Sequence, residues 1–172
     1  MEDEAEILRL QTAPRVHVAR KRANQIVKNI GITTPPVSLW RVIASLQESL
    51  NLFVEPYDDF GERVSGIIVV FADYAVIGFN TKQHWHRRRF TIAHEIGHLL
   101  LGHLCQQKNA GFPSQMPEER EANIFAAELL MPYEFLKKDF VATPSMDILS
   151  EKYRVSDEAL GWKIAKSGLL TK

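Results

Sequence analysis

The sequence predicts a single α+β domain in which a small β-sheet packs against a central helix and several further helices. The length of 172 residues suits one domain with its own core. A content of 45% hydrophobic and 24% charged residues is typical of a globular protein and excludes a disordered one. Apolar residues recur at helical spacing before residue 50 and after residue 87, and the stretch between is rich in β-branched and aromatic residues.

Two helices are expected before the β-rich region. Residues 1–14 form an acidic leader, and apolar residues at helical spacing then predict a first helix that stops at Gly31. After a pair of prolines, Ser38 can cap a second helix, and Asn51 marks its end.

Three β-rich stretches follow, at residues 52–56, 64–71 and 74–80. A short turn at Ala72-Asp73 would make the last two an antiparallel hairpin. Their apolar residues are nearly continuous, whereas a half-exposed strand would alternate apolar and polar residues. The pattern therefore predicts a sheet that helices largely cover.

The next helix is the expected centre of the fold. Residues 87–101 are apolar on most sides and end at Gly102, so this helix should be buried. Residues 104–116 form a loop. Pro117 then opens a helix through residue 130, with acids in the first turn, where the helix dipole favours them. Short helices are expected at residues 133–140, 146–153 and 157–167.

After the leader we divide the chain into a core at residues 15–140 and a helical tail at residues 141–172. The last two helices, with residues 153–156 between them, have the outline of a helix-turn-helix motif. The alternative is a tail that only packs on the core. Acidic and basic residues nearly balance in the tail, so it would read DNA weakly.

The most specific motif is His94-Glu95-Ile96-Gly97-His98, an HExxH pattern inside the central helix. Histidines four residues apart share one helix face, so both imidazoles can reach one metal ion while Glu95 stands beside the open coordination position. The alternative is a pair of hydrogen-bonded histidines with a solvated glutamate. Burying three such polar groups on an apolar helix is costly, which favours the metal site.

A catalytic zinc site needs a third protein ligand. His103 lies about half a turn off the ligand face, so we expect it at the surface or hydrogen-bonded to a ligand. Glu119, on the following helix, is the better candidate, and Asn123 one turn later can accept the outer ring N–H of a ligating histidine. Glu118 and Glu121 should be solvated helix charges, although Glu121 is the main rival ligand.

Residues 89–100 and 119–132 together resemble the ImmA/IrrE family of bacterial zinc metallopeptidases. The resemblance extends from about residue 19 to residue 132. It implies a compact gluzincin-like fold, with one Zn²⁺ per chain held by His94, His98 and Glu119. It also implies a substrate, because members typically cleave a helix-turn-helix transcriptional repressor, relieving repression after DNA damage or in mobile-element and phage-defence systems.

The chemistry expected of this site is peptide hydrolysis. Zinc lowers the pKa of its bound water to about 7, and Glu95 takes the proton and delivers it to the leaving amine. Tyr133 and His103 are close enough in sequence to be considered as donors to the oxyanion, but neither is assigned. An exposed edge of the hairpin at residues 64–80 could hold an extended substrate by strand addition.

The single cysteine, Cys105, admits two interpretations. Its thiolate could take the fourth zinc position and silence the enzyme until displaced. Alternatively it is a small buried hydrophobe.

Positive charge is concentrated in two blocks, since residues 7–47 and 74–94 contain no acid. If the blocks meet in space, they form one positive face able to attract phosphate or an acidic partner. The mixture of charged and aromatic side chains in the second block suggests contacts to single-stranded DNA that would stimulate cleavage. Alternatively, its arginines merely begin a helix. The residues expected to contact nucleic acid are Lys82, Trp85, Arg87 and Arg88.

The sequence therefore predicts a zinc-dependent endopeptidase that cleaves a repressor. We expect it in the cytoplasm, because the chain lacks an apolar run of membrane-spanning length and a signal peptide, and one cysteine suits a reducing compartment. One alternative is a non-catalytic DNA- or repressor-binding module with a structural metal, or none. Another is a zinc hydrolase acting on a non-peptide bond. A structural site needs no base, so Glu95→Gln separates the first alternative from the enzyme.

Overall fold

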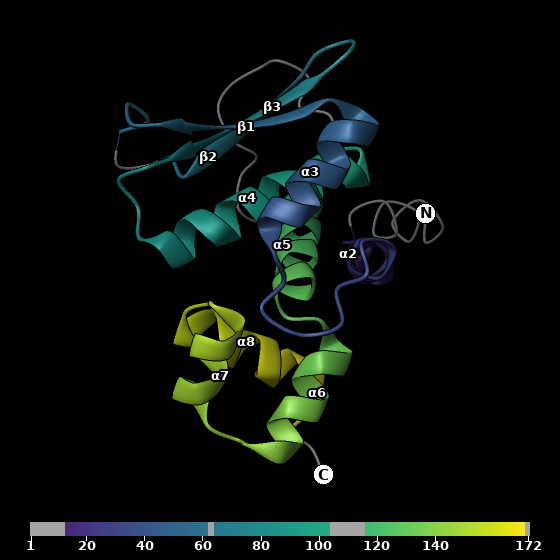
Figure 1. Cartoon of the computed structure of the whole chain (residues 1–172), viewed down its shortest axis with the longest axis vertical. Coiled ribbons are helices and arrows are strands. Elements are labelled where there is room, and N and C mark those ends of the chain that lie inside the picture. The colour runs from purple at the N-terminus through teal and green to yellow at the C-terminus, as the bar shows by residue number, and fades with distance from the viewer. Residues whose placement is uncertain (1–12, 62–63, 104–115, 171–172) are drawn as a thin grey trace, which may run out of the picture.

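The structure is a computed structural model that describes residues 13–61, 64–103 and 116–170. It has the predicted α+β architecture, with the sheet at one end, α6, α7 and α8 at the other, and α4 and α5 between them (Figure 1). The helices are α2 (Val16–Asn29), α3 (Leu39–Leu50), α4 (Trp85–Leu101), α5 (Pro117–Leu130), α6 (Tyr133–Ala142), α7 (Met146–Tyr153) and α8 (Asp157–Ser167). The strands are β1 (Leu52–Tyr57), β2 (Gly66–Val70) and β3 (Ala75–Asn80).

The expected ends of the first helices are present. Ser38 caps α3 by accepting a hydrogen bond from the backbone N–H of Arg41 at 3.4 Å. Asn51 ends that helix in the left-handed region, with φ of 50°. Gly31, with φ of 65°, follows Ile30, which caps the C-terminal end of α2. These caps fix where α3 stops and where β1 begins.

The sheet has the strand order β1-β3-β2. Strands β2 and β3 form the antiparallel hairpin that the sequence predicts, and β1 pairs with β3 in parallel. Strand β2 therefore lies at an edge of the sheet, next to α4. Its outer backbone groups remain open to a further strand in the described part of the chain.

Among the described residues, helices cover one face of the sheet only, which differs from the prediction of a largely covered sheet. Leu52 and Ile77 are fully buried, but Phe53, Ile67 and Val69 on the other face are 41%, 40% and 40% exposed. The outward rings contact one another, as in the edge-to-face pair of Phe53 and Tyr74 with centroids 6.3 Å apart. A strand with a continuous run of apolar residues can have one face exposed when aromatic side chains on that face pack against one another. The apolar run therefore did not show that helices cover both faces.

Small residues let α4 and α5 pack closely. A Cβ atom added at Gly97 would lie 3.0 Å from Phe125 and 3.2 Å from the Cα of Ala122. Ala122 and Ala126 have no exposed surface. These small residues hold the two helices that carry the candidate ligands at a short, fixed separation.

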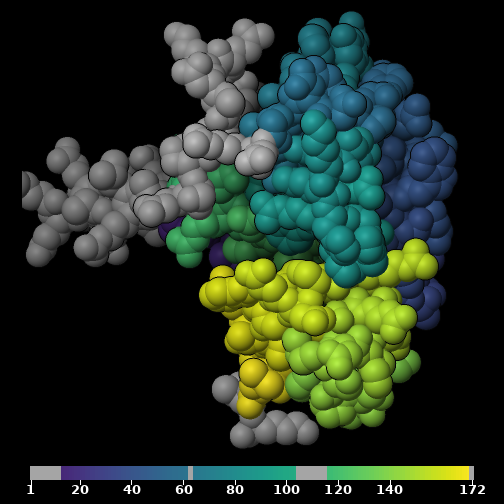
Figure 2. Space-filling view, turned by 90° about the vertical axis from the view of Figure 1, so that its left-hand side faces the viewer, coloured from purple at the N-terminus to yellow at the C-terminus, as the bar shows by residue number. Residues whose placement is uncertain are grey.

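The tail helices lie beside α4 and α5 (Figure 2). Leu149, Leu160 and Ile164 belong to the same buried apolar cluster as the residues of α2 to α5. Tyr153 is fully buried and donates a hydrogen bond to Asp139 of α6 at 2.8 Å. Among the described residues, none of the helices is long and apolar enough to cross a membrane.

Candidate metal centre

Two adjacent helices supply the candidate ligands. The HExxH motif lies in the C-terminal half of α4, which ends at Gly102 with φ of 72°. Helix α5 begins at Pro117, and this places Glu119 in the first turn, beside the histidines. His98 and Glu95 are buried, and His94 and Glu119 are partly buried.

The ligand atoms converge on one point. The Nε2 atoms of His94 and His98 are 3.0 Å apart, and they lie 3.3 and 3.2 Å from the two carboxylate oxygens of Glu119. All three residues offer an atom within 4.8 Å of the others. Two imidazoles and one carboxylate at such separations form the donor set of a catalytic zinc site, which keeps a further position open. The residues present therefore fit a zinc ion.

The pKa values of Glu119 and Glu95 are shifted in opposite directions. Burial alone would raise the pKa of Glu119, but hydrogen bonds and charges of His94 and His98 outweigh burial and lower the pKa to about 2. Burial raises the pKa of Glu95, although the same two histidines oppose the rise. Glu119 is thus a stable anion suited to binding a cation, and Glu95 is the more readily protonated carboxylate, as a proton carrier requires.

Asn123 lies behind His94. Its Oδ1 atom is 3.0 Å from the Nδ1 of His94. An amide oxygen can only accept, so Nδ1 carries the proton and the Nε2 lone pair faces the ligand point.

A longer chain of contacts lies behind His98. Its Nδ1 atom is 3.1 Å from the Nδ1 of His103, whose Nε2 atom is 2.9 Å from Glu121. Arg15 then pairs with Glu121 through its backbone N–H and its guanidinium, at 2.7 to 3.1 Å. With Nδ1–H of His98 donating to His103 and Nε2–H of His103 donating to Glu121, every donor meets an acceptor.

This chain corrects the expectation for Glu121, which is neither a ligand nor a solvated charge. Its exposed fraction is 3%, and its carboxylate is bound by His103 and Arg15. Burial alone would raise its pKa, but the hydrogen bonds from Arg15 and His103 lower it. His103, expected at the surface or beside a ligand, is buried beside His98. Arg15 was missed, because it precedes Glu121 by 106 residues and no local pattern connects them.

Strand β2 begins directly over the general-base candidate. A Cβ atom at Gly66 would lie 2.4 Å from the Cγ2 of Thr91 and 3.6 Å from the Cγ of Glu95. The absence of a side chain therefore brings the free sheet edge against Glu95. Glu119 lies in the first turn of α5, whereas Tyr133 follows the last turn of α5 and begins α6. At a rise of 1.5 Å per residue, the two residues are about 20 Å apart along the helix axis.

The candidate nucleic-acid contacts differ in their exposure and in their partners. Lys82 is exposed, and the ring of Trp85 packs against His86 with centroids 3.6 Å apart. Arg87 donates a hydrogen bond to Ser65 at 3.3 Å, while Arg88 is partly buried. The two acid-free blocks do meet, because Arg87 and Arg20 line one cavity. Cys105 lies outside the described residues.

The fold and the ligand set define a metallopeptidase-type protein. The model of the IrrE N-terminal-like domain family, Peptidase_M78, matches residues 48–164. The match spans more than half of the chain, which therefore belongs to this family. A search of curated proteins found no match.

A solved structure described as a Mycobacterium tuberculosis transcriptional regulator has a similar fold, with a TM-score of 0.68 and 15% sequence identity. The likeness covers 91% of this chain and 48% of that one. This chain therefore spans about half the length of that regulator.

Proposed function

We propose that this protein is a zinc-dependent endopeptidase of the cytoplasm that cleaves a helix-turn-helix transcriptional repressor. The observation that carries the proposal is the convergence of His94, His98 and Glu119 on one point, with Glu95 beside it in the same motif. Family membership supports the peptidase activity. The regulator with a similar fold supports a connection to transcription.

The proposed mechanism assigns a task to each residue. Bound zinc would polarise a peptide carbonyl and lower the pKa of a water molecule to about 7. Glu95 accepts the proton of that water and passes it to the leaving amine, and its raised pKa suits this exchange. Glu119 supplies one negative charge, which would offset half of the charge of a divalent ion. Asn123 and His103 hold the ligating rings in the tautomer that binds metal.

The edge of β2 is the proposed docking place for the scissile segment. An extended peptide can add to this edge through main-chain hydrogen bonds. At Gly66 this edge lies so close to α4 that an added Cβ atom would clash with Thr91 and would contact Glu95. A segment paired there would pass the general base.

Regulation is part of the proposal. Single-stranded DNA held by Lys82, Trp85, Arg87 and Arg88 would stimulate cleavage and connect it to DNA damage or to mobile-element and phage defence. Arg87 and Lys82 are exposed, as such contacts require. A thiolate of Cys105 at the fourth zinc position would silence the enzyme.

The decisive experiment uses purified full-length protein, zinc and a repressor encoded beside its gene, with and without single-stranded DNA. We expect zinc-dependent cleavage that Glu95→Gln abolishes while bound zinc, measured by elemental analysis, stays at one ion per chain. If the wild-type protein and the Glu95→Gln variant bind zinc and the repressor equally well and neither cleaves the repressor, the protein is a non-catalytic binding module instead. If no metal binds, the proposal fails.

A further inference from the structure

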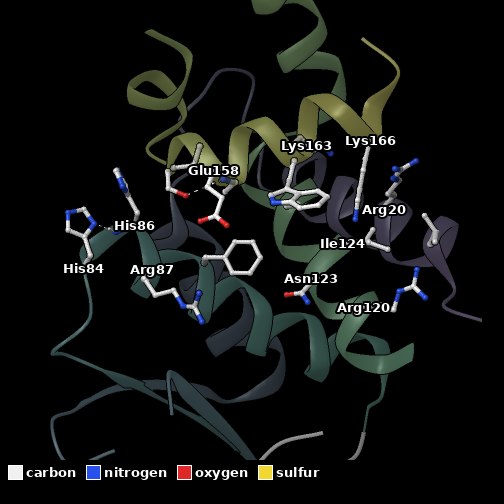
Figure 3. A pocket seen from close by; sticks show the side chains of 17 residues that line it. Arg20, His84, His86, Arg87, Arg120, Asn123, Ile124, Glu158, Lys163 and Lys166 are labelled. Carbon is white, nitrogen blue, oxygen red and sulfur yellow. Dashed lines mark hydrogen bonds between the residues drawn. The ribbon is translucent and has the colours of Figure 1, made fainter. Parts of the chain in front are cut away.

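A large cavity lies beside the metal centre. Its volume is about 880 Å³, and it is enclosed by residues of α4 and α5 on one side and α8 on the other, with α2 at one end (Figure 3). The HExxH chemistry does not account for this cavity. Its lining differs from that of the metal centre, because it combines several cations with an apolar wall.

The cations gather at one end of the cavity. Figure 3 shows Arg20, Arg120 and Lys166 on the same side of the cavity, with Arg87 and Glu158 towards the opposite end. Within the described parts of the chain, no acid forms an ion pair with these three cations. Lys163 differs, because the buried carboxylate of Glu128 neutralises it.

Cations that line a cavity and have no acidic partner among the described residues attract anions. Glu158 supplies the only carboxylate among the described residues of the lining. The basic end therefore suits a ligand that carries two or more negative charges.

The wall beside the cations is aromatic. Trp162 is 61% exposed, and the Nζ atom of Lys166 lies 5.1 Å from the centre of its ring. Phe90 also lines the cavity. An exposed tryptophan next to a group of cations is a common anchor for protein partners, because the ring contributes apolar area and the cations contribute specificity.

The cavity adjoins the metal centre through Asn123. This side chain lines the cavity (Figure 3), and its Oδ1 atom is 3.0 Å from the Nδ1 of His94. Phe90 lies one helical turn before His94, with ring centroids 6.4 Å apart. An extended chain advances roughly 3.3 Å per residue, so a few residues suffice to connect a scissile bond at the metal with a side chain in the cavity.

We propose that this cavity binds an acidic segment of the protein substrate, a few residues from the scissile bond. Carboxylates of the segment bind Arg20, Arg120 and Lys166, and a neighbouring aromatic or aliphatic side chain packs on Trp162. The proposal rests on the peptidase function proposed above and adds the chemistry of the sequence that the enzyme selects. A nucleic acid suits the cavity less well, because the cations form one cluster in a hollow and do not follow an extended groove, which a phosphate backbone needs.

The test measures binding of synthetic peptides by fluorescence anisotropy to the full-length, zinc-loaded Glu95→Gln protein. The probe is a fluorescein-labelled peptide with several Asp and Glu residues around one Phe. Comparison peptides carry Lys for the acids, or Ser for the Phe, and a single-stranded oligonucleotide serves as competitor. We expect the acidic peptide to bind, the basic peptide not to bind, and the affinity to fall on raising the salt from about 50 to about 200 mM.

Variants locate the binding. Arg20→Ala and Lys166→Ala should each weaken binding of the acidic peptide about twofold to fivefold, and together about tenfold. Arg22→Ala is the matched control, because Arg22 is an exposed arginine of the same helix outside the cavity, and it should leave affinity unchanged. Trp162→Ala should weaken binding of the Phe peptide and leave that of the Ser peptide unchanged.

Three results would overturn the proposal. They are equal binding of acidic and basic peptides, an affinity that Arg20→Ala and Lys166→Ala do not change, and an oligonucleotide that binds more tightly and displaces the peptide. The last result would assign the cavity to nucleic acid.

Cleavage assays separate this proposal from the peptidase function. In a protein with an intact Glu95, the double variant should raise KM for the repressor and leave kcat unchanged. Cleavage with an unchanged KM would remove the cavity proposal alone. Peptide binding without zinc-dependent cleavage by the wild-type protein would remove the peptidase function, and with it the assignment of the bound segment to a substrate.

Discussion

The two histidines of the candidate metal centre have different partners: His94 has an exposed neutral partner, and His98 has a buried network that contains charges. His94 contacts Asn123, a neutral and exposed residue of the neighbouring helix. His98 contacts the buried His103, whose partner Glu121 is ionised and bound by Arg15. Water can replace an exposed amide, but it cannot easily replace a buried carboxylate. From this comparison we expect changes on the His94 side to affect metal binding alone, and changes on the His98 side to affect folding as well.

The largest expected effect is that of Glu121→Ala on folding. The change leaves His103 and Arg15 without their shared acceptor, so the free energy of unfolding should fall by about 2–3 kcal/mol. Urea denaturation of the metal-free protein measures this free energy of unfolding. Glu134→Ala, at an exposed glutamate, is the control and should change the free energy by close to zero. Equal stability of the Glu121→Ala and wild-type proteins would contradict the comparison.

His103→Ala should lower both the stability of the fold and the affinity for zinc. It removes the acceptor that holds the ring of His98, so zinc affinity should fall about 10- to 100-fold. Competition with a chromophoric chelator gives the affinity. His17→Ala, an exposed histidine of α2, should leave it unchanged.

Asn123→Ala should lower zinc affinity about tenfold and leave the urea midpoint of the metal-free protein unchanged, because this residue is exposed. Asn123→Asp keeps an acceptor at the same place and should preserve most of the affinity. A loss of stability as large as that of Glu121→Ala would show that the two sides are alike.

The last expected effect is a dependence of stability on pH, which is confined to acid. The pKa of Glu119 is about 2 in the folded protein, below its ordinary value of 4.5. The ionised group therefore stabilises the metal-free protein above about pH 4.5, and this stabilisation is lost as the pH falls towards 2. Between about pH 5 and pH 3, wild-type protein should lose more stability in urea titrations than Glu119→Gln. Parallel losses would argue against the contacts of Glu119 with the histidines.

Local spacing explains what the sequence could predict. The positions of His94, Glu95 and His98 follow from the period of a helix, and so does the one-turn offset between Glu119 and Asn123. Helix ends followed from Ser38 and Pro117 in the same way. The structure contains each of these features, although the metal-binding roles of these residues stay predictions.

Long-range pairing explains what the sequence could not predict. Arg15 and Glu121 are far apart in the chain, and a buried glutamate in an acidic helix start looks like a solvated one. The open face of the sheet was missed because the apolar pattern of a strand does not reveal whether a helix covers it. The contact of Gly66 with Thr91 depends on how the edge strand is placed over α4, and no periodicity describes that.

The close approach of α4 and α5 at Gly97 has a consequence for metal selectivity. The ligands are divided between these helices, so their separation sets the width of the coordination cage. One additional methyl group at Gly97 would push the helices apart by a few tenths of an ångström, a displacement comparable to the differences between metal–ligand bond lengths of divalent ions. We therefore expect Gly97, which is not a candidate ligand, to influence which divalent ion the candidate site selects.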